Sequence, residues 1–250
     1  MTAMIVKEVH AKTILSKSKV FDYSVNPYIG CERGCTYCYA RFMKRYTGHK
    51  EEWGEFVDAK INAPSLLQVE LKKKTAGRVW MSGTCDPYQP LEKKYELTKK
   101  CLMALSKHAW PVTVQTKSSL VNRDVDLLRK INDVEVGVTI TTADDGTRKV
   151  FEPNSPPISE RIETLMKLRS AGIRTFAMIA PLLPKAEGLA ALLRRRADYV
   201  LIDKMNYHYA DWVYRKFKLQ YAMTDDFFAS KKKELASAFE KERIPCQVLF

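Results

Sequence analysis

Three cysteines at short spacing are the residues of this sequence best suited to chemistry. Cys31, Cys35 and Cys38 follow the pattern C-x3-C-x2-C on a loop that contains Gly30 and Gly34. Three thiolates can bind three irons of a [4Fe–4S] cluster, which leaves the fourth iron without a protein ligand. The spacing therefore predicts a cluster whose open iron accepts a small molecule that carries an amine and a carboxylate.

The residues around the thiols favour this cluster over two alternatives. Arg33 and Arg41 lie close in sequence and would favour the ionised thiols. A structural zinc site of Cys3His type, with His49 or His10 as the fourth ligand, is the main alternative. Three buried structural thiols are disfavoured, because flanking glycines indicate a tightly turned, exposed loop.

Length and composition predict one ordered, globular domain. The chain has 250 residues, of which 46% are hydrophobic, and this is enough to bury one substantial core. We expect a single domain over residues 1–250, with a core at about 20–205 and a C-terminal extension at 206–250. The stretch Met1 to Val9 has no long apolar region, and no run of about 18 apolar residues occurs. These features predict a cytoplasmic protein that does not bind a membrane.

The charge of the chain indicates a polyanionic partner. Lysine and arginine number 42 against 29 acidic residues, which gives a formal net charge of +13. Such an excess suits DNA or RNA, although lysines that only solvate helix surfaces would produce it as well.

Strand and helix patterns alternate along the chain. This order predicts right-handed βαβ units on a parallel sheet, either an open sheet or a closed or partial barrel. In both architectures chemistry occurs at the carboxyl ends of the strands. The predicted strands are 78–82, 111–116, 134–139, 173–179 and 199–202, and the predicted helices are 40–46, 91–107, 121–131, 158–171 and 187–197. A further helix is expected before Pro245, followed by a short apolar tail.

The sequence resembles the radical S-adenosylmethionine (SAM) superfamily. C-x3-C-x2-C with an aromatic residue before its last cysteine, here Tyr37, is the signature of that superfamily. Further similarity to its spore photoproduct lyase-like branch, often described as DNA repair photolyases, rests on five segments and Arg161. The segments are Asn26-Pro27-Tyr28, Asp86 to Pro90, Glu152-Pro153, Gly172-Ile173 and Ala180-Pro181.

The resemblance implies a fold, a chemistry and cofactors. The fold is a partial (β/α)6 barrel. A reduced [4Fe–4S] cluster, held by Cys31, Cys35 and Cys38, would cleave SAM to a 5′-deoxyadenosyl radical that abstracts hydrogen from a substrate. An electron donor such as ferredoxin or flavodoxin would be needed.

The resemblance also implies site residues. Tyr37 and Tyr39 flank the last cysteine and correspond to tyrosines implicated in cofactor contact or radical relay. Lys117 would meet the carboxylate of SAM, and Thr139 would lie near the cofactor. The segment Thr84-Cys85-Asp86 would border the cofactor as well.

One departure from the branch concerns the hydrogen donor. The lyase has Cys-Thr-Ser-Asp after its second strand, whereas this chain has Gly83-Thr84-Cys85-Asp86. Activity on spore photoproduct therefore does not follow from the resemblance. We expect Cys85 either to donate hydrogen to a product radical or to line the cofactor pocket. Asp86 beside it would raise the thiol pKa and keep the S–H form that donation requires.

Three functions remain open at this point. The favoured one is a radical enzyme that acts on damaged or modified nucleic acid, on a flipped or unpaired nucleotide. The aromatic stretch from Tyr207 to Phe217 would then stack on the base, or would simply pack against the barrel. The second is radical chemistry on a peptide or metabolite, and the third is a non-catalytic nucleic-acid-binding module stapled by a metal. Cys101 and Cys246 receive no role.

Overall fold

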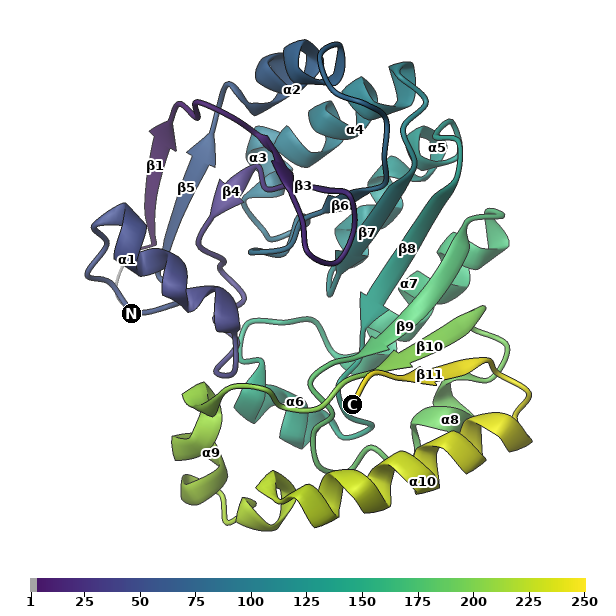
Figure 1. The fold of residues 1–250 in the computed structure, drawn as a ribbon. Helices are drawn as coiled ribbons and strands as arrows, with labels where there is room; N and C mark the ends of the chain where they lie inside the picture. The colour runs from purple at the N-terminus through teal and green to yellow at the C-terminus, as the bar shows by residue number, and fades with distance from the viewer. Residues whose placement is uncertain (1–3) are drawn as a thin grey trace.

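A long, mostly parallel sheet forms the centre of the computed structural model, which describes residues 4–250. The strand order is β11-β10-β9-β8-β7-β6-β3-β2, and every neighbouring pair from β3 to β11 is parallel (Figure 1). Strand β2 is antiparallel to β3 and forms one edge. The strands are β2 (Leu15–Lys17), β3 (Tyr23–Val25), β6 (Val79–Met81), β7 (Val112–Thr116), β8 (Val134–Thr139), β9 (Arg174–Ile179), β10 (Tyr199–Ile202) and β11 (Cys246–Val248).

This sheet has the architecture of a partial (β/α)6 barrel, as the sequence predicted. Strands β3 and β6 to β10 supply its parallel strands, and β11 adds one more beside β10. The apolar tail after Pro245 is thus an edge strand of the sheet. Since the strand order is linear over residues 4–250, with β2 and β11 at its two edges, the barrel is open.

Helices cover one face of the sheet and bury its alternate residues (Figure 1). Val112, Val136, Ala177 and Val200 lie in one hydrophobic cluster with Leu165 of α7 and with other helix residues. The C-terminal residues pack on the same cluster through Phe228, Leu235 and Phe239. The helices concerned are α2 (Ala63–Leu71), α4 (Leu97–Lys107), α5 (Val125–Leu128), α7 (Ile158–Ser170), α8 (Leu189–Leu193) and α10 (Asp225–Lys241).

The other face of the strands lines the barrel interior. Gly137 of β8 is required there, because a Cβ atom at this position would lie 2.2 Å from the ring of Phe176 on β9. Phe176 in turn stacks on Tyr199 of β10, with 5.2 Å between ring centroids. These rings occupy the interior nearer the start of β10 than its carboxyl end, since Tyr199 is the first residue of that strand.

A small second sheet lies beside the barrel and was not predicted. It has the order β1-β5-β4, in which β1 and β5 are parallel and β4 is antiparallel to β5. Its strands are β1 (Ile5–Val9), β5 (Phe56–Lys60) and β4 (Tyr28–Ile29). The remaining helical segments are η1 (Tyr39–Met43), α1 (Lys44–Thr47), α3 (Glu92–Tyr95), η2 (Ser119–Asp124), α6 (Asp145–Phe151), η3 (His208–Ala210), α9 (Asp211–Lys216) and η4 (Gln220–Met223).

Predicted strand bounds agree with the structure to within two residues, and helix α7 begins at Ile158 as expected. Gly172, with φ of 79°, follows the end of that helix. The helix predicted over 91–107 is instead interrupted at Glu96, which has φ of 52°. The Glu92 carboxylate accepts hydrogen bonds from the backbone N–H groups of Thr98 and Lys99 and thereby starts α4 as a separate helix.

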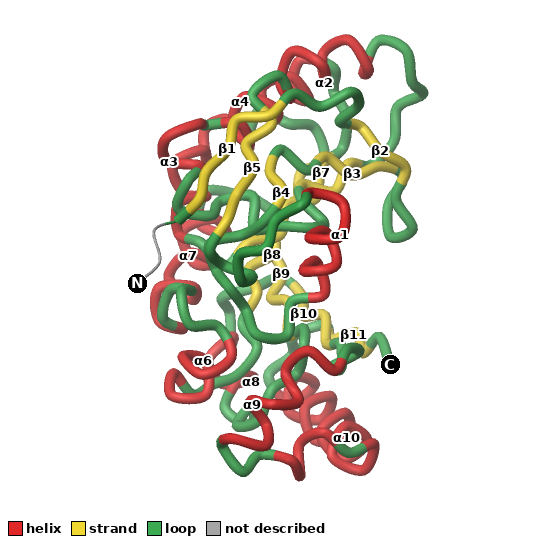
Figure 2. Tube along the Cα trace, turned by 90° about the vertical axis from the view of Figure 1, so that its left-hand side faces the viewer, coloured by secondary structure: helices red, strands yellow, loops and turns green. Residues whose placement is uncertain are grey.

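The helices predicted over 40–46, 121–131 and 187–197 also differ from the structure. The first two begin as the 3-10 segments η1 and η2, and the third is only α8. Helices α2 and α10 lie at opposite ends of the molecule in both views (Figures 1 and 2). Within residues 4–250, no helix is long and apolar enough to span a bilayer.

Candidate active site

The three thiols lie on one tight loop between β4 and η1. Gly30 and Gly34 have positive φ values of 85° and 57°, and a Cβ on Gly30 would lie 2.3 Å from the carbonyl oxygen of Phe56. All three cysteines are free. Burial raises the pKa of Cys31 and of Cys38, and the neighbouring Cys35 raises both further. The donor set, three close free thiols on a glycine-shaped loop, fits three corners of a [4Fe–4S] cluster.

The histidines proposed as zinc ligands are not available to these thiols. His49 Nδ1 lies 2.8 Å from Glu51, and Nε2 lies 3.0 Å from Asp58, with only 1% of the side chain exposed. His10 is exposed on the small-sheet side of the chain. No three His, Cys, Asp or Glu side chains within the described residues are arranged to hold a single ion. An iron–sulfur cluster does not require three ligands around one ion, because each thiolate binds a different iron.

The Asp86 carboxylate fixes the thiol loop to the end of β7. One oxygen accepts hydrogen bonds from Tyr88 N and Thr116 Oγ1, and the other from Lys117 N at 3.1 Å and Arg33 Nε at 3.3 Å. Four donors occupy the roughly four lone-pair sites of a carboxylate. These bonds make Asp86 a positioning residue that joins the thiol loop to β7. The backbone N–H of Asp86 also points at Cys31 Sγ, at 3.5 Å.

Arg33 does not supply the positive charge expected beside the thiols. It pairs with Asp86 and donates to the backbone carbonyls of Tyr88 and Asn154. Lys117 takes this role, because its charge lowers the pKa of Cys35 and Cys38 against the larger effect of burial. Arg41 acts in the same direction on Cys38.

A fully buried ion pair supports the other side of the thiol loop. Glu152 follows α6, Arg161 lies on α7, and their side chains are 0% exposed with 2.5 Å between Oε2 and Nη2. Glu152 also accepts hydrogen bonds from the hydroxyls of Tyr37 and Thr141. Although burial opposes it, Arg161 and Lys117 hold the pKa of Glu152 below its usual value. Sequence reasoning noted Glu152 and Arg161 only as matching residues and gave them no role.

Lys117 and Tyr37 lie near this ion pair, and Arg161 donates a hydrogen bond to the backbone carbonyl of Thr139 at 3.0 Å. Lys117 Nζ lies 4.0 Å from Glu152 and 5.7 Å from the centroid of the Tyr37 ring. Thr139 ends β8, is 2% exposed, and accepts a hydrogen bond from Gln115 at 3.3 Å. The three predicted residues therefore surround the same strand ends as the thiols.

The segment after β6 is organised by Asn26. Its side-chain oxygen accepts hydrogen bonds from Ser82 Oγ at 2.8 Å and from both the N–H and the hydroxyl of Thr84 at 2.9 Å. Ser82 Oγ lies 3.1 Å from Cys85 Sγ. Burial raises the pKa of Cys85 to about 12, the Ser82 hydroxyl opposes this shift, and Asp86 adds to it. Burial therefore has a larger effect on the pKa of this thiol than the Asp86 carboxylate that was expected to raise it.

The predicted aromatic stretch divides into rings with different surroundings. The Tyr39 hydroxyl donates to the Gly83 carbonyl, and its ring stacks on Tyr207 at 5.8 Å, which stacks on Tyr209 at 6.0 Å. Tyr214 is buried, whereas Trp212 remains half exposed. Tyr207 thus borders the thiol loop, and Tyr214 belongs to the core.

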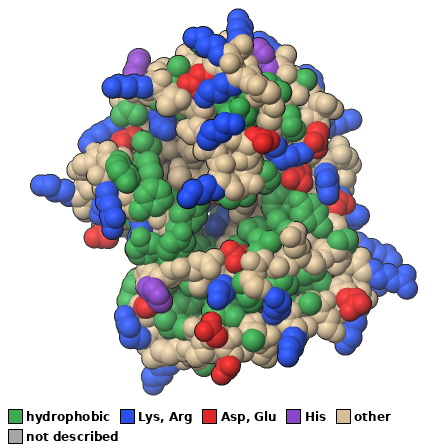
Figure 3. Space-filling view, in the orientation of Figure 1, with side chains coloured by type: hydrophobic (Ala, Val, Ile, Leu, Met, Phe, Trp, Pro, Cys, Tyr) green, Lys and Arg blue, Asp and Glu red, His purple; other side chains and the backbone are tan. Residues whose placement is uncertain are grey.

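The molecule is hollowed near these groups. Figure 3 shows hydrophobic side chains on both sides of a hollow near the centre of the face, and a basic side chain is visible inside it. In the same orientation, Figure 1 shows the ends of the central strands and the loop before η1 around this region. A ligand can therefore reach the strand ends from this face.

The matches to known proteins agree with this geometry. The sequence matches the Radical SAM superfamily over residues 25–188. This chain belongs to the radical SAM superfamily. Membership of this superfamily supports the assignment of the chain as a radical SAM enzyme. It also implies that SAM and an iron–sulfur cluster are the cofactors.

Relatives of this radical SAM chain include proteins with and without a described activity. An uncharacterized protein of Methanocaldococcus jannaschii is 38% identical over 179 residues, which cover 71% of this chain and 67% of that protein. An uncharacterized protein of Mycobacterium tuberculosis is 30% identical, and the match spans only 56% of its length and 71% of this chain. A radical SAM Nalpha-GlyT isomerase of Pseudomonas phage M6 is 23% identical over 63% of this chain and 32% of that protein.

The fold of the radical SAM chain is similar to that of spore photoproduct lyase. A lyase variant with bound SAM and dinucleoside spore photoproduct superposes with a TM-score of 0.73 at 14% identity, covering 99% of this chain and 82% of that one. The recognition of a radical SAM chain with a lyase-like fold is thereby confirmed.

The buried ion pair yields a first prediction. Arg161→Met should lower the free energy of unfolding by about 3–5 kcal/mol, because it leaves the Glu152 charge buried without its partner. Urea denaturation measures this change. Adding Glu152→Gln to the same chain should recover part of the loss.

The matched control lies on the same helix. Lys167 pairs with Glu163 at 2.7 Å, but both side chains are more than half exposed. Lys167→Met should therefore change stability by less than about 1 kcal/mol. Equal losses in the two single variants would show that the buried pair has no special importance.

Proposed function

We propose that this chain is a radical SAM enzyme that acts on a base of an unpaired or flipped nucleotide in nucleic acid. The carrying observation is the thiol loop, held by Asp86 on one side and Glu152 on the other at the carboxyl ends of the strands. When bound, the reduced cluster and SAM supply a 5′-deoxyadenosyl radical that abstracts hydrogen from the substrate. The protein contributes binding, orientation and control of hydrogen.

In this proposal Cys31, Cys35 and Cys38 ligate three irons, and Lys117 binds the carboxylate of SAM. Lys117 suits this role because its side chain is 16% exposed while Cys35 and Glu152 keep its pKa raised despite burial. An ammonium so largely shielded from water would orient a carboxylate more strongly than a surface lysine would.

The other predicted site residues border the same region. Tyr37 and Thr139 would line the cofactor pocket, and Tyr39 would cover its outer side, where its ring is 36% exposed. Thr84 and Asp86 would shape the pocket through their backbone, since their side chains are engaged with Asn26 and with Arg33, respectively.

The substrate class rests on charge and on similarity to the lyase. The formal net charge of +13 suits a polyanion. The lyase variant with the similar fold was solved with a dinucleoside lesion. A base within a duplex is shielded, so the target would be extruded or single-stranded. Tyr207, which is 50% exposed and stacks on Tyr39, would offer an aromatic edge near it.

Two further elements complete the proposal. Residues 1–250 would act as one domain, because the extension at 206–250 packs on the barrel core through Phe228 and Phe239. A ferredoxin or flavodoxin would supply the electron that reduces the cluster.

The cluster is tested first. Anaerobically reconstituted protein should contain about four irons per chain and should lose them when Cys31, Cys35 and Cys38 are replaced by alanine. Reduced protein should convert SAM to 5′-deoxyadenosine, and SAM should perturb its electron paramagnetic resonance spectrum. Stoichiometric zinc without labile sulfide would instead identify a metal-stapled, non-catalytic module.

The substrate class is tested by binding. Single-stranded or mismatched oligonucleotides should bind more tightly than matched duplex, with affinity that falls as salt rises, because neutralised phosphates release counterions. Fluorescence anisotropy of a labelled strand measures this. No binding at low salt would redirect the proposal to a peptide or metabolite.

Cys85 is proposed to return a hydrogen atom to the product radical. Its S–H bond would break homolytically, the hydrogen would pass to the substrate radical, and a thiyl radical would remain. One electron from the donor and one proton from solvent would then restore the thiol. Cys85→Ala should keep iron content and 5′-deoxyadenosine formation but divert the substrate to side products, as measured by mass spectrometry. Cys246→Ala on β11 is the control variant. If Cys85→Ala gives the same products as the wild type, Cys85 only lines the pocket and does not donate hydrogen.

A further inference from the structure

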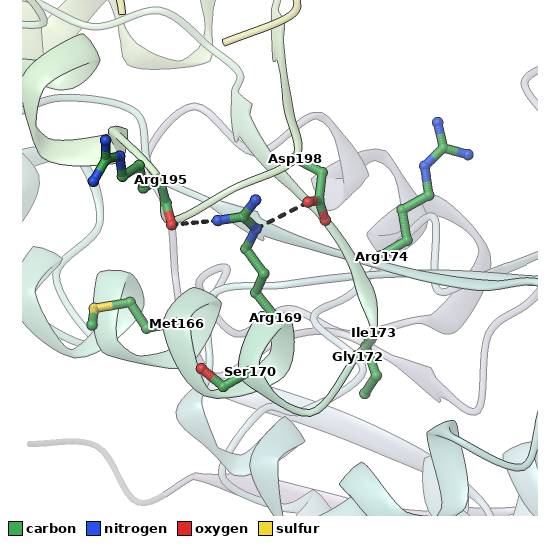
Figure 4. A pocket seen from close by; sticks show the side chains of 8 residues that line it. All are labelled: Met166, Arg169, Ser170, Gly172, Ile173, Arg174, Arg195 and Asp198. Atoms are coloured by element: carbon green, nitrogen blue, oxygen red, sulfur yellow. Dashed lines mark hydrogen bonds and ion pairs between the residues drawn. The ribbon is translucent and has the colours of Figure 1, made fainter. Parts of the chain in front are cut away.

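A second concave region lies at the opposite end of the sheet from the thiols. A depression of about 640 Å³ is bordered by the end of α7, the start of β9 and the turn before β10 (Figure 4). A neighbouring depression of about 520 Å³ is bordered also by the end of α10. The two share Arg169, Arg195 and Asp198. Because the strands are parallel, this region faces away from the strand ends where the catalytic groups lie.

The region is strongly basic. Six basic and two acidic side chains border it, and we call the basic set the arginine depression. Its members are Arg169, Arg174, Arg194, Arg195, Lys241 and Arg243.

The two acidic side chains of the region, Asp198 and Glu242, already form ion pairs within the chain. Asp198 pairs with Arg169 at 3.0 Å and accepts from Thr175 N at 2.8 Å, and Glu242 pairs with Arg194 at 3.1 Å. Arg195 and Arg243 have no ion-pair partner among residues 4–250. Figure 4 shows the Arg195 and Arg174 side chains on either side of the Arg169–Asp198 pair. The depression therefore retains excess positive charge directed to solvent.

Arg195 occupies a backbone position that favours glycine. Arg194 has φ of −50° and ψ of 122°, Arg195 has φ of 57°, and Arg196 N donates to Leu193 O at 2.9 Å. This is a type II turn with arginine at the third position, where positive φ makes glycine the favoured residue. The local fold gives no reason for an arginine there.

Arg243 occupies a similar position after α10. It has φ of 56°, its N–H donates to Glu240 O, and Ile244 N donates to Phe239 O. These two bonds form a Schellman motif, in which glycine is preferred at the left-handed residue. Two arginines of one depression thus occupy left-handed positions that glycine can take without strain. Since neither has an ion-pair partner among residues 4–250, their guanidinium groups remain available to an anion.

We propose that the arginine depression binds phosphates of the nucleic-acid strand whose base is presented at the catalytic end. This inference rests on the proposed function and adds a second contact to it. The six residues of β9 separate the two ends by about 20 Å at about 3.3 Å per residue. A strand with a rise of about 3.4 Å per nucleotide needs roughly six nucleotides to cover that distance. Short substrates cannot reach the depression, and longer ones can.

The test uses the cluster-loaded enzyme with Arg195→Gly and Arg243→Gly combined. Binding of labelled single strands of 4 and 20 nucleotides is measured between 50 and 500 mM salt. For the 20-mer, the slope of log affinity against log salt should become less steep by about 1.4, since each lost phosphate contact on a single strand is worth about 0.7. Because 50 to 500 mM is a tenfold change in salt, this slope difference makes the ratio of wild-type to variant affinity about 25-fold larger at the lowest salt than at the highest. The 4-mer should bind with unchanged affinity.

Thermal unfolding supplies a second readout. The melting temperature should be unchanged or higher in the glycine variant, because glycine adopts positive φ without strain. Arg195→Gln with Arg243→Gln removes the charge but keeps the side-chain bulk, and it should give the same loss of slope. The control variant, Lys72→Ser with Lys73→Ser, removes two exposed charges after α2 and should leave the slope unaltered.

The outcomes separate this inference from the proposed function. Wild-type salt slopes in both arginine variants, or an equal loss in the lysine control, would overturn the arginine depression as a phosphate site. Absence of salt-dependent binding in the wild type would instead overturn the nucleic-acid substrate itself, and the inference with it.

Discussion

The charge of Glu152 constrains the whole catalytic end of this molecule. A carboxylate with no solvent exposure is tolerated only where opposite charge and hydrogen bonds compensate its lost hydration. Arg161 of α7 supplies the charge, and the hydroxyls of Tyr37 and Thr141 supply hydrogen bonds. These partners come from the thiol loop, the end of β8 and α7. Satisfying one buried charge therefore sets the relative position of three segments.

Asp86 fixes the other side of the thiol loop in a similar way. Its carboxylate joins Arg33 of the loop to the N–H of Lys117 at the end of β7. The loop is thus fixed between two carboxylates that belong to different parts of the barrel. Rigid support of this kind suits a site that must hold reacting groups within a fraction of an ångström.

Local sequence patterns predicted much of the fold, but they did not predict the interactions of Glu152 and Asp86 that hold the thiol loop. The bounds of β8 and β10 follow from runs of β-branched residues, and the thiol loop follows from its cysteine spacing. In the small sheet, Ile5 of β1 pairs with Phe56 of β5. Neither short segment has a sequence pattern that predicts a partner so far along the chain. Arg33 was expected to act on its sequence neighbours, the thiols, but tertiary structure directs it to Asp86, 53 residues away. Interactions between distant residues decide the roles of charged groups, and spacing alone does not reveal them.

An open barrel exposes two strand edges, and the lengths of β2 and β11 bear on how such a protein avoids self-association. Each has only three residues in the described part of the chain, and Lys17 ends β2. Short edge strands offer few unpaired backbone groups to another strand, and the charge of Lys17 disfavours pairing at β2 further. The barrel can therefore remain open without presenting a long template for aggregation.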